Sequence, residues 1–415
     1  KKNAAAILFF IHKDSTMPRS PSPAQILSRA LDQADPELLA RLFDLPSHLR
    51  PESSKKLPPI NLKSGADTPQ DSSLLTDSWQ QLLQLLASLQ KAQNAQDAFD
   101  VQKKIHSLYN ANFANSSGNW CVPALHAVCR NTFYLANLSD GDTTKESAKE
   151  MAVTLLQESF SRTLNDRTVY NPNDGLSTTG SKKEGVLCVV NILFKIYFKL
   201  NKLRLCKNLL KPVESYKLNT KSTDMTQKIV FNYYVGRLFL FEDNFEKAEQ
   251  CLMFAYSNAE PWNKRRILNF LLPIKLLRGR LPQKRLLEKY EMHQYVPLVD
   301  GLRNGDLKSF SDALEKYGEL FLKRGTFLLL EKCKYIVYRN LFKRCWMIMN
   351  KTNQIPLHVM QKALIFCGTS VDIDEVECIA ANLIYRNYMR GYLSHTKRVL
   401  VLSKRDPFPT ASVIK

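Results

Sequence analysis

The sequence predicts an all-α protein: a right-handed stack of helical hairpins similar to tetratricopeptide repeats, ending in a C-terminal winged helix. Three observations lead to this prediction. Apolar residues recur at helical spacing almost without interruption after Leu74. Two stretches, 189–215 and 231–259, resemble each other as helix–turn–helix units. Near the C-terminus, three helical segments are followed by a short β-like segment, which is the order of a winged helix.

Residues 1–75 are expected to form a mostly disordered extension. Nine of the nineteen prolines lie between residues 18 and 69, among Ser, Asp and Lys, a composition that buries too little surface to offset chain entropy. One island, Ile26–Leu45, has the spacing of short amphipathic helices, and a nascent helix in a tail is favoured there over a docking helix. Met17 follows a short apolar run, so residues 1–16 are expected to lie upstream of the natural start.

Helical repeats are expected over residues 76–223 and, in a second domain, over residues 224–333. The small residues Gly236 and Ala248 allow paired helices to approach closely, as hairpins of this type require. The aromatic residues Tyr234, Phe239 and Phe254 are expected in the core, although the repeat period is too irregular to identify a particular repeat family.

The second domain, 224–415, is expected to continue into a winged helix over residues 334–404 and a short tail. Its first helix is predicted as one long segment, Gly325–Met349, and its second as Pro356–Phe366, where proline suits a first turn.

The third helix of the predicted winged helix begins with a capping signal. Asp372 is followed three residues later by Glu375, the spacing of a capping box. Gly391 is expected to end this helix, and residues 392–404 are expected to form two short strands.

Charge is distributed unevenly along the chain. The formal net charge is +20, from 59 Lys and Arg against 39 Asp and Glu. Residues 1–181 carry 18 basic and 18 acidic side chains, whereas residues 182–415 carry 41 and 21. Such a field attracts phosphate backbones, anionic membranes or acidic proteins, and the simpler alternative is a basic, solvated surface.

The sequence argues against secretion, a membrane span and catalysis. Nine cysteines, an odd number scattered singly, suit a reducing compartment. The early apolar run Ala4–Ile11 is far shorter than the roughly 20 residues that span a bilayer. There is no Walker A string, no His-Glu-x-x-His and no Cys-x-x-Cys, and the seven histidines are dispersed. We therefore expect no enzyme activity, no catalytic residues, no metal and no cofactor.

Several long strings resemble one family of proteins. They extend over most of residues 76–415 but not over residues 1–75 or the loop 165–182, and strings of this length seldom arise by chance. The chain resembles the Thp-type family of PCI proteins, the PCI subunits of the TREX-two messenger-RNA export complex. The strings are LFKIYFKLNKLRLCKNLL (193–210), YYVGRLFLFEDNFEKAEQCL (233–252), NKRRILNFLLPIKLLRG (263–279), IVYRNLFKRC (336–345), DIDEVECIAANLIYRNYMRGYLSH (372–395) and DPFP (406–409).

The resemblance implies partners and a location. In that family the subunit packs beside a large GANP-type scaffold that has its own PCI domain, and a small acidic DSS-type subunit clamps the assembly. The two adjacent winged helices form a platform for RNA or DNA. The complex sits at the nuclear pore basket, which implies a nuclear location at the pore or envelope, with some cytoplasmic protein possible and no membrane partner.

Basic residues of the winged helix are the candidates for nucleic-acid binding. The start of the third helix, which normally reads bases, carries Asp372, Asp374, Glu375 and Glu377, and these acids would repel phosphates. The cations are expected together at the other end, where they would contact backbone rather than bases, the alternative being a solvated wing. The candidates are Arg386, Arg390, Lys397, Arg398 and Lys404, with Lys264, Arg265 and Arg266 as an extension of the platform and Arg278, Arg280, Lys284 and Arg285 as a second patch.

Two further groups are candidates for protein partners. Lys323, Arg324, Lys332 and Lys334 surround the entry to the predicted long helix and suit an acidic DSS-type peptide. Leu328–Leu330 are expected to supply apolar surface between the two pairs of cations. Trp346, Met347 and Met349 lie near the edge of the winged helix and suit the scaffold interface.

Two functions remain open. The favoured one is a non-enzymatic scaffold that also binds nucleic acid in mRNA export. The alternative is a protein-binding PCI subunit of a proteasome-lid or signalosome-like assembly, without nucleic-acid binding. Lid and signalosome relatives typically continue past the winged helix into a long helix, which is not expected after Leu402. That difference and the local excess of positive charge favour the first function.

Overall fold

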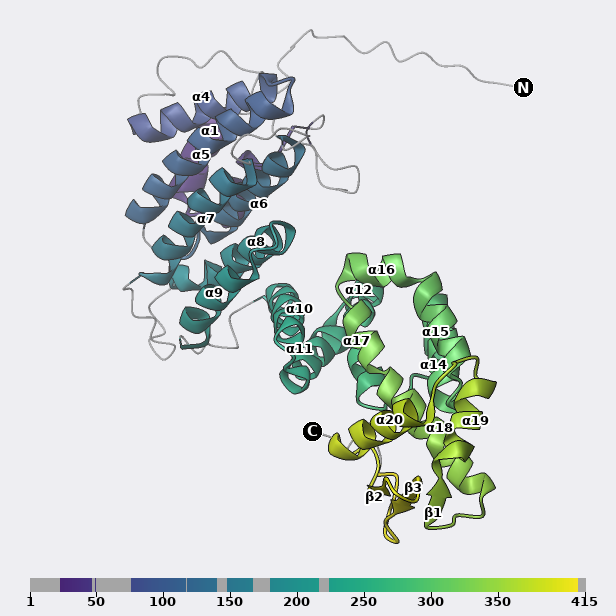
Figure 1. Cartoon of the computed structure of the whole chain (residues 1–415). Coiled ribbons are helices and arrows are strands. Elements are labelled where there is room, and N and C mark those ends of the chain that lie inside the picture. The colour runs from purple at the N-terminus through teal and green to yellow at the C-terminus, as the bar shows by residue number, and fades with distance from the viewer. Residues whose placement is uncertain are drawn as a thin grey trace, which may run out of the picture. The chain divides into compact units, whose positions relative to one another are not determined.

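The structure, a computed structural model, describes residues 23–46, 49, 76–116, 118–139, 148–166, 180–215 and 224–409. Residue contacts divide the chain into two units, 1–223 and 224–415, and each is described by itself (Figure 1). Within the described ranges the only strands are three short ones, and the rest of the regular structure is helical. The predicted all-α class is therefore confirmed. No helix in these ranges is long and apolar enough to cross a membrane.

Unit one is a series of helices in which each packs against the next along the chain, from α4 to α9. Fully buried rings such as Phe99, Tyr109 and Phe194 form its core. Its elements are α1 (Pro23–Asp32), α2 (Pro36–Leu42), α4 (Asp77–Lys91), α5 (Ala95–Asn115), α6 (Val122–Ser139), α7 (Ala148–Leu164), the 3-10 turn η2 (Lys182–Gly185), α8 (Val186–Lys199) and α9 (Leu203–Ser215).

The first two helices are docked on unit one, so the expectation of a nascent helix in a tail is wrong for this segment. Asp35 caps α2 by accepting hydrogen bonds from two N–H groups of its first turn. Leu27 and Leu39 are fully buried, and α2 packs on α6. The side chain of Asn131 on α6 donates to the carbonyl of Phe43. The apolar face that the sequence shows is buried because α6 provides a surface for it.

A buried polar network joins α5, α6 and α7 in unit one. The two ring nitrogens of His106 each lie 2.8 Å from a hydroxyl oxygen, Thr132 Oγ1 on one side and Ser159 Oγ on the other. His106 is completely buried, and burial lowers its pKa to about 4, although the charge of Glu158 opposes the shift. The imidazole is therefore neutral, and this Ser–His pair has no access to a substrate.

We expect His106 to make unit one sensitive to acid. Because the folded-state pKa lies below the unfolded value of 6.5, the stabilisation by the neutral imidazole is fully present above about pH 6.5 and is lost as pH falls towards 4. The loss should approach about 3 kcal/mol. Urea unfolding followed by circular dichroism at pH 7 and pH 4 should show a smaller pH effect in His106→Gln than in wild type. The exposed His358→Gln serves as control, and equal pH effects in the two variants would contradict this account.

Unit two begins with a helical hairpin of the predicted kind and continues through α12 and then through shorter helices. Its helical layers are α10 (Met225–Phe241), α11 (Phe245–Asn258), α12 (Pro261–Leu277), α13 (Lys284–Lys289), the 3-10 turn η3 (His293–Tyr295), α14 (Val296–Asn304), α15 (Leu307–Lys316), α16 (Gly318–Arg324) and α17 (Phe327–Lys332).

The close approach of α10 and α11 depends on a glycine. A Cβ atom at Gly236 would lie 2.7 Å from Leu252 Cγ and 3.3 Å from the carbonyl oxygen of Ala248, so no larger side chain fits without a shift. This confirms the expected role of the two small residues. Phe254, expected in the core, is 38% exposed, so that part of the prediction is wrong, whereas Tyr234 and Phe239 are partly buried.

The predicted long helix Gly325–Met349 is in fact two helices. Gly325 has a φ of +70° and ends α16, and the chain then forms α17 and, after Cys333, α18 (Lys334–Ile348). The break has a packing reason, because α17 packs on α12 whereas α18 packs on α14 and α15. Lys332, at the end of α17, is at the surface, whereas Arg339 on α18 is buried.

The C-terminal part of unit two is a winged helix. After α18 come β1 (Gln354–Pro356), α19 (Leu357–Phe366), α20 (Ile373–Tyr385), β2 (Gly391–Ser394) and β3 (Val399–Leu402). The strands form an antiparallel sheet in the order β1-β3-β2, with Ile355 opposite Leu400 and Leu393 also opposite Leu400. The predicted second and third helices and the hairpin are confirmed, and β1 is an additional strand.

The capping box at the start of α20 is confirmed, but the predicted end of the helix is wrong. Asp372 accepts a hydrogen bond from the N–H of Glu375, whose carboxylate accepts from the N–H of Asp372. The helix ends at Tyr385 rather than at Gly391. Gly391 begins β2 instead, where a Cβ atom would lie only 2.2 Å from the carbonyl oxygen of Val401. A glycine is needed there for close strand pairing.

The last described residues are held across α18 by a buried arginine. Arg339 Nη2 donates to the carbonyl oxygens of Phe408 (2.8 Å) and Pro409 (2.7 Å), and burial lowers its pKa, although Asp406 opposes the shift. The ring of Phe408 packs against Trp346. The string DPFP therefore belongs to the folded winged helix.

Candidate nucleic-acid interface

The acidic start of α20 is paired with the tip of the β2–β3 hairpin. Glu377 lies 2.9 Å from His395 Nδ1, and Asp374 lies 3.8 Å from Arg398 Nη2. Both basic groups belong to the turn between the strands, which therefore folds back towards the N-terminal end of α20. We call Lys397 and Arg398 the wing tip. Of these two, Arg398 shares its charge with an acid of α20, whereas the structure shows no ion pair between Lys397 and any described residue.

A second basic group lies at the other end of the hairpin, and we call Arg386, Arg390 and Lys404 the basic end. The backbone N–H of Ser403 donates to the carbonyl oxygen of Arg390, which brings Lys404 beside it. Arg390 forms an exposed ion pair with Asp406 (3.3 Å), and the guanidinium of Arg386 lies over the ring of Tyr335, 4.4 Å from its centroid.

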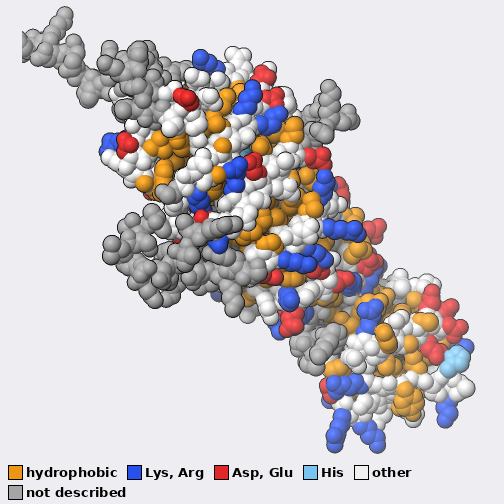
Figure 2. All heavy atoms as spheres, turned by 90° about the vertical axis from the view of Figure 1, so that its left-hand side faces the viewer, with side chains coloured by type: hydrophobic (Ala, Val, Ile, Leu, Met, Phe, Trp, Pro, Cys, Tyr) orange, Lys and Arg blue, Asp and Glu red, His pale blue; other side chains and the backbone are white. Residues whose placement is uncertain are grey.

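The structure therefore divides the predicted basic cluster in two, and the expectation of one cluster away from the acids is wrong for the wing tip. The strands carry the hairpin turn back to the acidic end, so only the basic end is separated from Asp374 and Glu377. In Figure 2, Lys and Arg side chains project at the lower end of the molecule, with a group of Asp and Glu side chains to one side.

The first turn of α12, expected to extend the platform, has partners of its own. Lys264 lies over the ring of Tyr256, and Arg265 pairs with Glu291 at 2.9 Å. Only Arg266 is exposed without an ion pair among the described residues.

Two members of the expected second basic patch surround a buried carboxylate. Glu249 on α11 is almost fully buried and lies 2.6 Å from Arg278, 2.9 Å from Arg280 and 3.3 Å from Lys275. Burial alone would raise the pKa of Glu249, but the hydrogen bond from Lys275 and the three positive charges outweigh it and lower the pKa. Arg278 and Arg280 are thus paired with a carboxylate of the fold. Of that patch, Lys284 and Arg285 remain as candidates for nucleic-acid binding.

The four residues expected to bind an acidic partner lie on three helices, α16, α17 and α18. Lys323, at the end of α16, pairs with Glu319, and Arg324 lies half-buried beside Tyr295. Lys332 pairs with Asp243 at 2.8 Å, and Lys334 lies 3.7 Å from Glu331. All the ion pairs among these are at the surface, where such pairs contribute little to stability.

A cavity of about 510 Å³ lies beside Lys332 and Lys334, between α17, α18 and α20. Leu328 lines it and is 69% exposed, whereas Leu329 and Leu330 are buried in the core. The expectation that all three leucines supply apolar surface is therefore wrong for two of them. Sequence reasoning missed the cavity, because one of its walls comes from α20, nearly 50 residues further along the chain.

Exposed apolar side chains mark the ends of α18 and α19. Of the residues expected at the scaffold interface, Met347 is exposed, Met349 is half-buried, and Trp346 is half-buried against Phe408. The sequence analysis missed Ile348 (80% exposed) on α18, and on α19 it missed Ile365 and Phe366 (92% exposed). Their spacing along the helices is the same as that of buried core residues, so the local sequence does not distinguish exposed from buried apolar side chains here.

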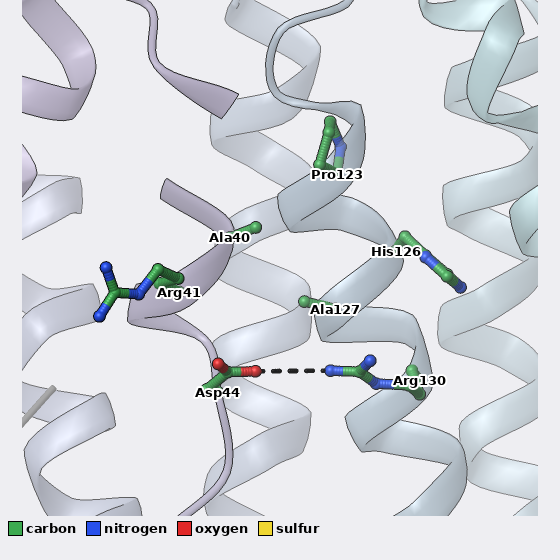
Figure 3. A pocket seen from close by; sticks show the side chains of 7 residues that line it. All are labelled: Ala40, Arg41, Asp44, Pro123, His126, Ala127 and Arg130. Carbon is green, nitrogen blue, oxygen red and sulfur yellow. Dashed lines mark ion pairs between the residues drawn. The ribbon is translucent and has the colours of Figure 1, made fainter. Parts of the chain in front are cut away.

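Unit one contains a smaller pocket of about 220 Å³ between α2 and α6. In Figure 3, Asp44 and Arg130 close one side of it with an ion pair at 3.6 Å, while Arg41 and His126 point away from each other. The space exists because Ala40 and Ala127 are small. Among the residues that the structure describes, no three His, Cys, Asp or Glu side chains are placed to hold a metal ion.

Comparison with known proteins identifies the family. A family model, the PCI domain, matches residues 314–404, from α15 to just after β3. PCI domain-containing protein 2 of Xenopus laevis is 37% identical over 77% of this chain and 80% of its own, and that of Danio rerio is 38% identical over 75% and 78%. The chain belongs to the PCI domain-containing protein 2 family. Enhanced ethylene response protein 5 of Arabidopsis thaliana is 33% identical over 92% of both chains. The family supports a role as a PCI-domain subunit of a protein complex.

We expect Glu249 to stabilise unit two. Replacing it by Gln leaves three cations around a site without a negative charge, which should lower the free energy of unfolding by about 2 kcal/mol. Urea unfolding monitored by circular dichroism measures the change. Glu246→Gln, at an exposed position on the same helix, should stay within about 0.5 kcal/mol of wild type. If both variants unfold like wild type, the cluster does not stabilise the fold.

Proposed function

We propose that this protein is a non-enzymatic scaffold subunit of a nuclear-pore-associated mRNA export complex of the TREX-two kind. In this proposal it binds RNA and DNA through the backbone with little sequence preference. The observation that carries the nucleic-acid part is the basic end of the winged helix. There Lys404 lies beside Arg390, and Arg386 caps the end of α20 opposite to the acids that begin it.

The local energetics favour phosphate binding at the basic end. The Arg390–Asp406 pair is exposed, and pairs of this kind contribute about 1 kcal/mol or less, so a phosphate can compete with Asp406. Arg386 is already ordered on Tyr335, so its side chain loses less conformational freedom on binding. Phosphates at the other end of α20 would meet Asp374 and Glu377, which argues against insertion of this helix into a major groove.

The wing tip and the first turn of α12 have lesser roles in this proposal. Asp374 shares the charge of Arg398, and Lys397 is the more available cation of the wing tip. Lys264, Arg265 and Arg266 add positive potential at a distance from the basic end.

The proposed partners use two other surfaces. A GANP-type scaffold with its own PCI domain would cover the exposed apolar side chains at the ends of α18 and α19, with Met347, Ile348 and Phe366 as anchors and Trp346 and Met349 beside them. A small acidic DSS-type subunit would pass along α16, close to Lys323 and Arg324. This assembly would place the protein in the nucleus at the pore basket, with some in the cytoplasm.

Charge reversal at the basic end tests the nucleic-acid part of the proposal. Arg390→Glu with Lys404→Glu should weaken binding to single-stranded RNA and duplex DNA about equally, on the order of tenfold at low salt. The slope of log affinity against log salt should also become shallower by about 0.7–0.9 for each lost phosphate contact. Fluorescence anisotropy of labelled oligonucleotides measures both quantities.

Lys397→Glu at the wing tip is the matched control and should have a smaller effect. Unchanged affinity in the double variant would remove the basic end from the interface. A wild-type protein that binds neither nucleic acid at low salt would favour the alternative, a PCI subunit that binds only proteins.

A further inference from the structure

The cavity between α17, α18 and α20 has a lining that suits a nucleotide. Tyr335 and Tyr338 contribute from α18, Ile379 and Asn382 from α20, and Leu328 from α17. A volume of about 510 Å³ is within the range of small-ligand sites. Four of its eight lining residues are apolar or aromatic, and one exposed carboxamide, that of Asn382, can both donate and accept hydrogen bonds.

Positive charge lies on one side of this cavity. Lys332 and Lys334 line it together with one acid, Glu331, which pairs with Lys334. Lys332 pairs with Asp243, and both acids are exposed. Exposed pairs of this type exchange readily for another anion. An apolar cavity flanked by two lysines is complementary to a base that carries a phosphate.

The cavity is also continuous with the basic end. Ile379 and Asn382 lie on one face of α20, and Arg386, which caps the end of this helix, continues the spacing at i+7. Tyr335 joins the two regions directly, because it lines the cavity and also lies beneath the guanidinium of Arg386, 4.4 Å away. A strand whose phosphates bind the basic end is therefore positioned to place a base in the cavity.

We propose that this cavity binds an unpaired base of a single-stranded nucleic acid, with Tyr338 as the stacking surface, Asn382 as the hydrogen-bonding group and Lys332 and Lys334 at the adjacent phosphate. The inference rests on the proposed nucleic-acid binding and adds a preference for single strands. A base within a duplex is stacked and paired, and it cannot enter. Stacking is tolerant of sequence because every base has a flat face, which agrees with binding that has little sequence preference.

Oligonucleotides of equal length, with and without bases, separate base binding from backbone binding. The full-length protein should bind a labelled 12-residue oligouridine more tightly than an abasic oligonucleotide of the same length and charge, and more tightly than a 12-base-pair duplex. Tyr338→Ala and, separately, Asn382→Ala should weaken oligouridine binding, about fivefold or more for Tyr338→Ala. Neither variant should change the affinity for the abasic strand. Oligothymidine of equal length shows whether RNA and single-stranded DNA are treated alike.

Control variants keep the test interpretable. Tyr338→Phe preserves the ring and should bind like wild type, and Phe254→Ala removes an exposed ring on α11 without touching the cavity. Asn382 is exposed, so its substitution does not threaten the fold, and circular dichroism checks Tyr338→Ala.

Three results would overturn the proposal. Equal wild-type affinity for oligouridine and the abasic strand would reject the cavity while leaving backbone binding intact. Equal losses on both strands in Tyr338→Ala would mean that the variant perturbs the basic end rather than a base site. Displacement of a cavity-bound probe by an acidic, phenylalanine-containing peptide, but not by oligouridine, would assign the cavity to a protein. Absence of binding to every oligonucleotide would instead reject the proposed nucleic-acid function itself.

Discussion

Helix α18 has to pack on two layers of unit two at once, and the position of the winged helix depends on it. On one side the corner between α14 and α15 approaches so closely that a Cβ atom at Gly305 would lie 2.6 Å from the backbone nitrogen of Leu341. Gly305 also has a φ of +66°, so both its conformation and its contact require glycine. Asn340 donates to the carbonyl oxygen of Leu302 at the same contact. On its other sides α18 packs on α19 and α20 and holds the last described residues through Arg339.

The charges along α20 connect helix stability with the proposed function. Carboxylates in the first turn and Arg386 at the C-cap both suit the helix dipole. The same arrangement leaves phosphate binding possible at one end only. Glu377 and Asp374 then position the wing tip through His395 and Arg398, so the acids have a structural role of their own. The electrostatics thus direct a bound strand along α20 towards Tyr335 and the cavity.

Local patterns predict much of this fold, and the corrections arise where distant segments meet. The capping box at Asp372, the hairpin after it and the need for a small residue at Gly236 follow from neighbouring residues. The docking of α1 on α4 and of α2 on α6 joins segments that no short window contains. The break at Cys333 depends on the different partners of α17 and α18, and the division of the basic cluster depends on how the β2–β3 hairpin folds back. For the site, individual cations could be identified from the sequence, but their neutralisation by Glu249 or Asp374 could not.

The central claim is that the winged helix carries the nucleic-acid interface. Photo-crosslinking of the full-length protein to a 4-thiouridine-containing RNA tests it most directly, with the crosslinked peptides identified by mass spectrometry. The account predicts that crosslinks concentrate in α18, α20 and the segment 386–405, and that they include peptides containing Tyr335, Tyr338 or Asn382. Crosslinks confined to unit one, or spread evenly over lysine-rich surfaces of both units, would contradict it.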